Sequence, residues 1–165
     1  MDSMQTKQIV RLQDNLSVIR RIAGWTTEEL GNMIGVTKAT ISNLENKKSP
    51  MTLTQYIAIR TVIDHEIQTN TENTVLPQVV SILLDNDDLS EKEQKELSQK
   101  INTVAAAAGG GVSGVALASL FATVAALPFL GVATMPLTIT GMWLPKILRS
   151  RKKQKDKNKE DNKNG

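Results

Sequence analysis

The sequence predicts an all-α protein: a small four- to five-helix N-terminal domain, connector helices, and a C-terminal apolar helical hairpin with a disordered basic tail. Three observations lead to this fold class. Apolar residues recur at helical spacing through the first part of the chain, and Thr or Ser residues precede several of these stretches as N-caps. Residues 104–145 carry no charged side chain. We therefore expect divisions at residues 1–68, 69–103, 104–148 and 149–165.

The N-terminal domain is expected to begin with a frayed polar segment at residues 1–8. Apolar residues from Ile9 to Ile22 then follow a helical period, and Gly24 ends that helix. Thr26 with Glu29 forms a capping box for the next helix. The expected helices cover residues 9–22, 26–34, 37–46 and, from Thr52 or Thr54 onward, a fourth helix with its buried side reaching Ile63.

The connector follows a polar linker at residues 68–73. A short apolar helix is expected over Val75–Leu84, and an acidic turn at residues 85–88 should be solvated. Ser90 and Glu93 form another capping box, and the helix that they open becomes apolar after Ile101. We expect residues 69–103 to act as a connector or a dimer contact.

A compact motif occupies residues 26–45. Leu30, Ile34, Ile41 and Leu44 are spaced to face a core from two short helices. Gly35 is expected to supply a turn with positive φ. With this motif, residues 15–63 resemble the Cro/repressor-type helix-turn-helix family, often called XRE. The resemblance implies that the two helices approach most closely at Gly31, where a small residue is needed.

The resemblance implies a domain that binds double-stranded DNA, with the second helix of the motif in the major groove, and a homodimer. Asn43 can hydrogen-bond an adenine edge, and Lys47 and Lys48 follow the recognition helix, where they can clamp the DNA backbone. The DNA-contacting positions carried over from the family are Thr26, Thr27, Thr37, Lys38, Ala39, Thr40, Ser42, Asn43, Lys47 and Lys48.

Two features depart from the family pattern. Thr27 stands where the family commonly has a glutamine that helps to hold a phosphate. Residues 1–70 carry eight Lys/Arg and seven Asp/Glu, although Lys38, Lys47, Lys48, Arg20 and Arg21 can still form a basic face. A helix-turn-helix that binds protein and no longer reads DNA therefore remains an alternative.

The uncharged run predicts two membrane spans, Val104–Ala126 and Phe129–Leu148, because one span needs about 20 residues. Residues 146–165 carry nine Lys/Arg against three Asp/Glu, which favours a cytoplasmic tail in contact with anionic lipid. The DNA-binding domain must also face the cytoplasm, so an even number of spans is required. Trp143 is then expected at the membrane interface.

Enzymatic activity is not expected. The chain has no cysteine and one histidine, His65, which we place on the surface, so no metal site is expected. Gly109–Gly111 is not followed by the Gly-Lys-Ser/Thr of a phosphate loop, and no catalytic residue or cofactor is expected. No apolar stretch opens the chain, so a cleavable secretory signal is not expected either.

The combined expectation is a repressor-like transcriptional regulator tethered to the inner face of the cytoplasmic membrane, with both ends in the cytoplasm. One alternative is a soluble oligomeric repressor whose apolar half is an oligomerisation module. Another is a membrane-active hairpin protein that uses its helix-turn-helix to recruit a partner.

Overall fold

The computed structural model describes residues 3–86 and 90–108, together with residues 118–119, 122, 143–145 and 147. These residues contain helices and no strand, in agreement with the predicted all-α class. The elements are α1 (Ser3–Ile22), α2 (Thr27–Ile34), α3 (Lys38–Glu45), α4 (Leu53–Thr69), α5 (Val75–Val80), the π-helical turn η1 (Ser81–Asp85) and α6 (Glu91–Ala108).

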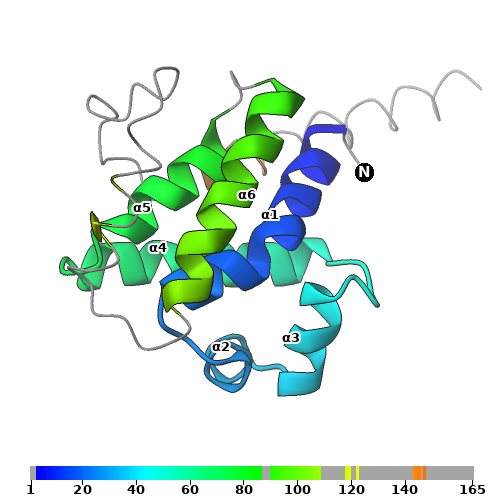
Figure 1. Cartoon of the computed structure of the whole chain (residues 1–165). Helices are drawn as coiled ribbons and strands as arrows, with labels where there is room; N and C mark the ends of the chain where they lie inside the picture. Colours follow the sequence, from blue (N-terminus) through cyan, green and yellow to red (C-terminus); the bar gives the residue numbers. More distant parts are fainter. Residues whose placement is uncertain are drawn as a thin grey trace, which may run out of the picture.

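The longest helices form the body of the molecule, and the short pair α2 and α3 lies at one end of it (Figure 1). Helices α1 and α6 run side by side, and α4 crosses behind them in this view. Helix α5 and the turn η1 also pack on α1. The α2–α3 pair is thus presented at the edge of a helical body.

Hydrogen-bonding N-caps explain where the short helices begin. The Thr26 hydroxyl accepts from the Glu29 amide at 3.1 Å, and the Glu29 carboxylate accepts from the Thr26 amide at 2.6 Å. Thr37 caps α3 through the Thr40 amide. Thr52, with Gln55 as its box partner, is the residue that caps α4. The predicted capping box at Thr26 and the cap at Thr37 are confirmed, and α4 begins from Thr52 rather than Thr54.

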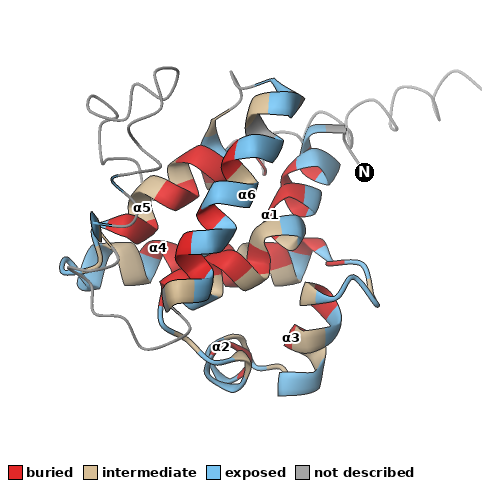
Figure 2. Ribbon diagram, viewed as in Figure 1, coloured by how far each residue is buried: buried red, intermediate tan, exposed pale blue. Residues whose placement is uncertain are grey.

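The core is a continuous apolar cluster to which every described helix contributes (Figure 2). Helices α1 and α4 supply its centre, and α2 and α3 close it at one end. The fully buried members include Leu12, Leu16, Ile19, Leu30, Ile41, Leu44, Ile59, Ile63, Leu76, Leu97 and Ile101. Most apolar positions that the helical periodicity identified are therefore buried, and Ile34 is partly buried against the same core.

The start of the chain differs from its prediction. Helix α1 begins at Ser3, and the side chains of Gln5 and Gln8 are buried. The Gln5 amide nitrogen donates to the carbonyl oxygen of Ile147 at 2.9 Å. The expectation of a frayed segment was wrong because a polar sequence forms a stable helix when a distant segment satisfies its buried side chains.

The connector helices share the core of the N-terminal helices. The Asn73 amide donates to the carbonyl oxygen of Ile22 at 2.7 Å, and the Ser98 hydroxyl donates to Asn15 at 3.0 Å. Asp85, which we expected in a solvated turn, forms a two-oxygen contact with Arg60 of α4 at 2.6 and 2.8 Å. A dimer contact through residues 69–103 stays a prediction.

The ends of the predicted membrane hairpin lie against the helical body. Val104 and Ala105 are buried in α6, so the apolar run begins inside a packed helix. Trp143 is only 8% exposed, and its indole N–H donates to Asp64 at 2.6 Å, so its predicted place at a membrane interface was wrong in this structure. Its ring packs edge-on against Tyr56 with centroids 5.6 Å apart.

Among the described residues, no helix is long and apolar enough to cross a membrane. Most of the predicted spans, Val104–Ala126 and Phe129–Leu148, and the predicted disordered tail at residues 149–165 lie outside the described residues. Membrane attachment therefore stays a prediction.

Candidate nucleic-acid interface

The α2–turn–α3 unit has helix-turn-helix geometry. Gly35 ends α2 in the left-handed conformation with φ 72°, which glycine adopts without strain. A Cβ added at Gly31 would lie 2.8 Å from the carbonyl oxygen of Val36, so the close approach predicted at this residue is confirmed. Two glycines therefore set the angle and the distance between the two helices.

Helix α3 buries Ile41 and Leu44 and leaves its other side open. Lys38, Ala39 and Asn43 are exposed, and Thr40 and Ser42 are half-buried beside them. The Asn43 side chain has no hydrogen-bond partner within the described part of the chain, so both its amide donor and its acceptor are available. The predicted recognition residues thus share one accessible helix face.

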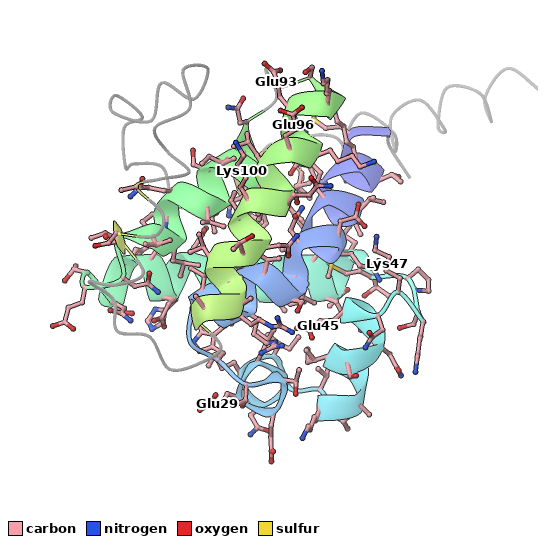
Figure 3. The ribbon with its side chains drawn as sticks, in the orientation of Figure 1. Glu29, Glu45, Lys47, Glu93, Glu96 and Lys100 are labelled. Atoms are coloured by element: carbon pink, nitrogen blue, oxygen red, sulfur yellow. The ribbon has the colours of Figure 1, made fainter. Side chains whose placement is uncertain are left out.

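The N-termini of α2 and α3 differ in how well each can bind a phosphate. Glu29 is labelled on α2 in Figure 3. Its carboxylate already occupies the end of this helix, because it accepts from the Thr26 amide. This contact lowers the pKa of Glu29, so the site holds a negative charge at neutral pH. At α3 the first turn contains Lys38 and no acid, so its N-terminus suits an anion better.

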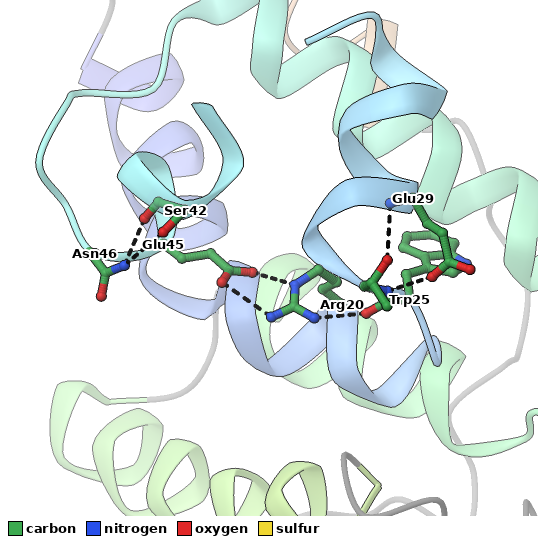
Figure 4. A network of polar contacts seen from close by, with 7 residues as sticks. Arg20, Trp25, Glu29, Ser42, Glu45 and Asn46 are labelled. Carbon is green, nitrogen blue, oxygen red and sulfur yellow. Dashed lines mark hydrogen bonds and ion pairs between the residues drawn. The ribbon is translucent and has the colours of Figure 1, made fainter. Parts of the chain in front are cut away.

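The far end of α3 is fixed by a buried ion pair (Figure 4). The Arg20 guanidinium donates to the two carboxylate oxygens of Glu45 at 2.5 and 3.2 Å and to the Trp25 carbonyl oxygen at 2.7 Å. The side chains of Arg20 and Glu45 are 11% and 10% exposed. Arg20 therefore holds α3 against α1 and is not part of the basic face that we expected.

The loop after α3 carries the remaining lysines. Lys47 has φ 56°, in the left-handed region, at the position where the family usually has glycine. Its ammonium group lies 2.6 Å from a carboxylate oxygen of Asp14 in α1. Lys48 is exposed, and its amide donates to the Asn43 carbonyl oxygen at 2.9 Å. Both lysines therefore lie in the loop that directly follows α3.

Sequence reasoning missed Gln13, which organises this loop from α1. Its amide nitrogen donates to the carbonyl oxygens of Leu44 at 3.1 Å and Ser49 at 2.7 Å. Its carbonyl oxygen accepts from the Met51 amide at 3.0 Å. No local pattern marks this residue, because all of its partners lie more than 30 positions away in the sequence.

The described residues contain no group of three or more His, Cys, Asp or Glu side chains that could hold a metal ion, and His65 is exposed. The accessible groups of this face are amides, hydroxyls, a methyl group and ammonium groups. These groups suit hydrogen bonding and ion pairing with a polyanion.

Comparison with known proteins finds two relatives, each over 49 residues of this chain. The chain is 41% identical over 49 residues to Antitoxin HipB of Escherichia coli strain K12, which covers 30% of this chain and 56% of that protein. It is 39% identical over 49 residues to Antitoxin HipB of E. coli O6:H1 strain CFT073, covering 30% and 52%.

The chain therefore spans about half the length of the curated relatives that it matches. No family model and no solved structure matches it. The likeness and the geometry together support a helix-turn-helix unit in this chain.

Proposed function

We propose that this chain is a sequence-specific, repressor-like DNA-binding regulator without enzymatic activity. The observation that carries the proposal is the open face of α3, where Lys38, Ala39 and Asn43 are exposed on a helix held rigidly from behind by Arg20 and Glu45. A helix of this kind fits the major groove of B-form DNA. The 49-residue likeness to two antitoxins adds support.

In the proposed complex the N-terminal part of α3 enters the major groove. Asn43 offers a donor and an acceptor to an adenine edge, and the methyl groups of Ala39 and Thr40 can contact a thymine methyl. The N-terminus of α3, which Thr37 caps and whose first turn has no acidic side chain, binds a phosphate. Lys47 and Lys48 bind the backbone at the other end of the helix.

Two of the predicted DNA-contacting residues, Thr26 and Thr27, have a smaller part in the proposed complex. Thr26 has its amide and hydroxyl engaged with Glu29, so we assign it a capping role before a phosphate role. Thr27 is half-buried and has a short side chain, so it contributes little reach toward DNA. A homodimer that reads two half-sites remains part of the proposal.

The test is selection of binding sites from random duplexes by the full chain. We expect enrichment of one short sequence, to which Asn43→Ala binds about 1–3 kcal/mol less tightly while keeping its affinity for unrelated duplexes. Lys48→Ala is the matched control, because removing a phosphate contact weakens binding to every sequence equally. Selection that enriches no sequence would overturn the proposal.

A membrane location for the uncharged part of the chain is a separate proposal, supported by sequence only. If Trp143 stays docked on α4, residues 109–142 remain for insertion, and these 34 residues fall short of two spans of about 20 each. Membrane insertion as a two-span hairpin therefore requires Trp143 to leave Asp64. Fractionation of cells without detergent tests this location directly.

A further inference from the structure

Helix α1 lies outside the helix-turn-helix, yet two adjacent residues of it contact the loop that joins α3 to α4. Gln13 hydrogen-bonds the loop backbone, and Asp14 pairs with Lys47. We propose that Gln13 is a positioning residue for the DNA-backbone contacts of this loop and that Asp14 competes with DNA phosphate for Lys47. This inference rests on the proposed DNA-binding function.

The proposed role of Gln13 rests on the hydrogen bonds formed by both its amide nitrogen and its amide oxygen. The amide nitrogen donates to carbonyl oxygens at the end of α3 and in the loop, and the amide oxygen accepts from the start of the next segment. One side chain thereby joins residues 44, 49 and 51, on both sides of Lys47 and Lys48. A short loop held at both ends has few conformations left to lose when DNA binds.

The backbone at Lys47 shows that the loop geometry is imposed rather than intrinsic. The left-handed conformation is disfavoured for a lysine, because its Cβ comes too close to the following carbonyl oxygen. The conformation persists because surrounding contacts determine it, and the Gln13 hydrogen bonds are such contacts. Removal of the Gln13 amide would allow Lys47 to relax away from the position in which the loop presents it.

Asp14 acts on the same lysine in the opposite direction. Its carboxylate lies 2.6 Å from the Lys47 ammonium group, and the Lys47 and Asp14 side chains are 62% and 44% exposed. An exposed pair of this kind is weak, so a phosphate can displace the carboxylate. Displacing the carboxylate costs part of the attraction between Lys47 and the phosphate, so Asp14 lowers the affinity that Lys47 would otherwise give.

The proposal predicts opposite effects for neighbouring substitutions, measured with a fluorescein-labelled duplex of mixed sequence over a range of salt concentrations. Asp14→Asn should bind roughly two- to fivefold more tightly at low salt, because an exposed ion pair is worth a fraction of a kcal/mol up to about one. Gln13→Met, which keeps the side-chain length, should bind at least about fivefold more weakly. The plot of the logarithm of its binding constant against the logarithm of salt concentration should also become shallower. The slope should change by about 0.9 for each phosphate that a lysine no longer neutralises.

Background variants separate these roles from general effects. In Lys47→Ala, Asp14→Asn should no longer change the affinity. In the variant Lys47→Ala/Lys48→Ala, Gln13→Met should have no further effect on duplex binding, although exchange of the Met51 amide hydrogen should still be faster than in the parent. Each variant is first checked for a helical spectrum and a cooperative unfolding transition.

Three outcomes would contradict the proposal. If Asp14→Asn still raises the affinity for the duplex in the Lys47→Ala background, Asp14 acts through its charge in general and not through Lys47. If Gln13→Met still weakens duplex binding in the Lys47→Ala/Lys48→Ala background, Gln13 acts by stabilising the fold and not by positioning the two lysines. A wild-type chain that binds no duplex at any salt concentration would overturn the DNA-binding function and this inference together, whereas the first two outcomes leave DNA binding intact.

Discussion

Arg20 and Glu45 illustrate how a buried charge depends on its partner. Both side chains are about nine-tenths buried, and the pair is bidentate. Arg20→Met would leave the Glu45 carboxylate buried beside an apolar chain, so we expect the free energy of unfolding to fall by about 3–5 kcal/mol. Urea-induced unfolding followed by circular dichroism measures this decrease.

The double variant Arg20→Met/Glu45→Leu is the matched control. Replacing both members of a buried pair with apolar residues is often neutral, so most of the stability should return. If Arg20→Met alone costs less than about 1 kcal/mol, the pair is not holding α3 as described.

Tyr56 provides a built-in probe of the core, because it is the single tyrosine of the chain. Burial raises its pKa to about 12, with Asp85 and Asp64 adding to the rise and Arg60 opposing it. Unfolded tyrosine ionises near pH 10 while the folded residue keeps its proton. Its contribution to stability is therefore present below about pH 10 and is lost as the pH rises toward 12, by about 3 kcal/mol in all.

Titration of the tyrosinate absorbance checks this directly. In the folded chain the absorbance should rise only near pH 12, and in urea it should rise near pH 10. Tyr56→Phe should flatten the fall in unfolding free energy over this range, while other alkaline transitions remain. A folded-state midpoint near pH 10 would contradict the burial of this side chain.

Single-residue roles were predictable from sequence where the chemistry is local. Thr26 and Glu29 lie three positions apart, and Thr37 directly precedes an apolar helical pattern, so both caps could be read from the chain. The contacts of Gln13 and the contact between Arg60 and Asp85 could not be predicted in this way. These partners are brought near by tertiary packing, and nothing in the neighbouring residues indicates it.

At the scale of helical elements, the backbones of α2 and of the turn before α3 approach closely at Gly31. The carbonyl oxygen of Gly31 accepts from the Val36 amide at 2.9 Å, and the Val36 carbonyl oxygen lies 2.8 Å from the position of an added Cβ. Gly31→Ala must therefore move backbone rather than a flexible side chain. We expect a decrease of about 1–3 kcal/mol in unfolding free energy, measured by thermal or urea unfolding.

Asn32→Ala is the control for this substitution. Asn32 is the exposed neighbour of Gly31 on the same helix, so replacing its side chain should change stability by less than about 0.5 kcal/mol. Equal effects at the two positions would mean that helix propensity, rather than the close approach at Gly31, controls the result.

At the level of elements the sequence predicted the order and type of the N-terminal helices, because periodicity and caps agree there. It placed the start of α1 too late, since Gln5 and Gln8 look solvated until the residues that cover them are known. It also began the apolar spans at Val104, where the structure continues α6 into the core. A lack of charge does not distinguish a membrane segment from a segment buried in protein.

At the scale of the whole molecule, residues near the two ends of the described chain contact the same helical body. Trp143 and Ile147 lie against α4 and α1. Trp143 packs beside the buried Arg60 and Asp64, and Arg60 also pairs with the exposed carboxylate of Asp85. The Arg60 guanidinium carbon lies 5.7 Å from the centre of the Trp143 ring, within the range of a cation–π interaction. The C-terminal half thus contributes to the stability of the N-terminal helices.

Two substitutions of Trp143 should lower the stability of the full chain to different extents. Trp143→Phe keeps a ring against Tyr56 but removes the indole N–H bond to Asp64, so we expect the free energy of unfolding to fall by about 1–3 kcal/mol. Trp143→Ala also removes the packing and should cost about 3–5 kcal/mol. Urea unfolding gives both values, and the milder variant keeps the measurement possible if the alanine variant fails to fold.

Trp25→Phe is the matched control, because Trp25 is half-buried and forms no hydrogen bond with Asp64 in the described structure. The same variants also test the proposed membrane location. Because a docked Trp143 leaves too few residues for two spans, Trp143→Ala should raise the fraction of chain that sediments with membranes, and Trp25→Phe should not. Unfolding curves that are identical for wild type and Trp143→Ala would show that the two ends of the chain do not stabilise each other.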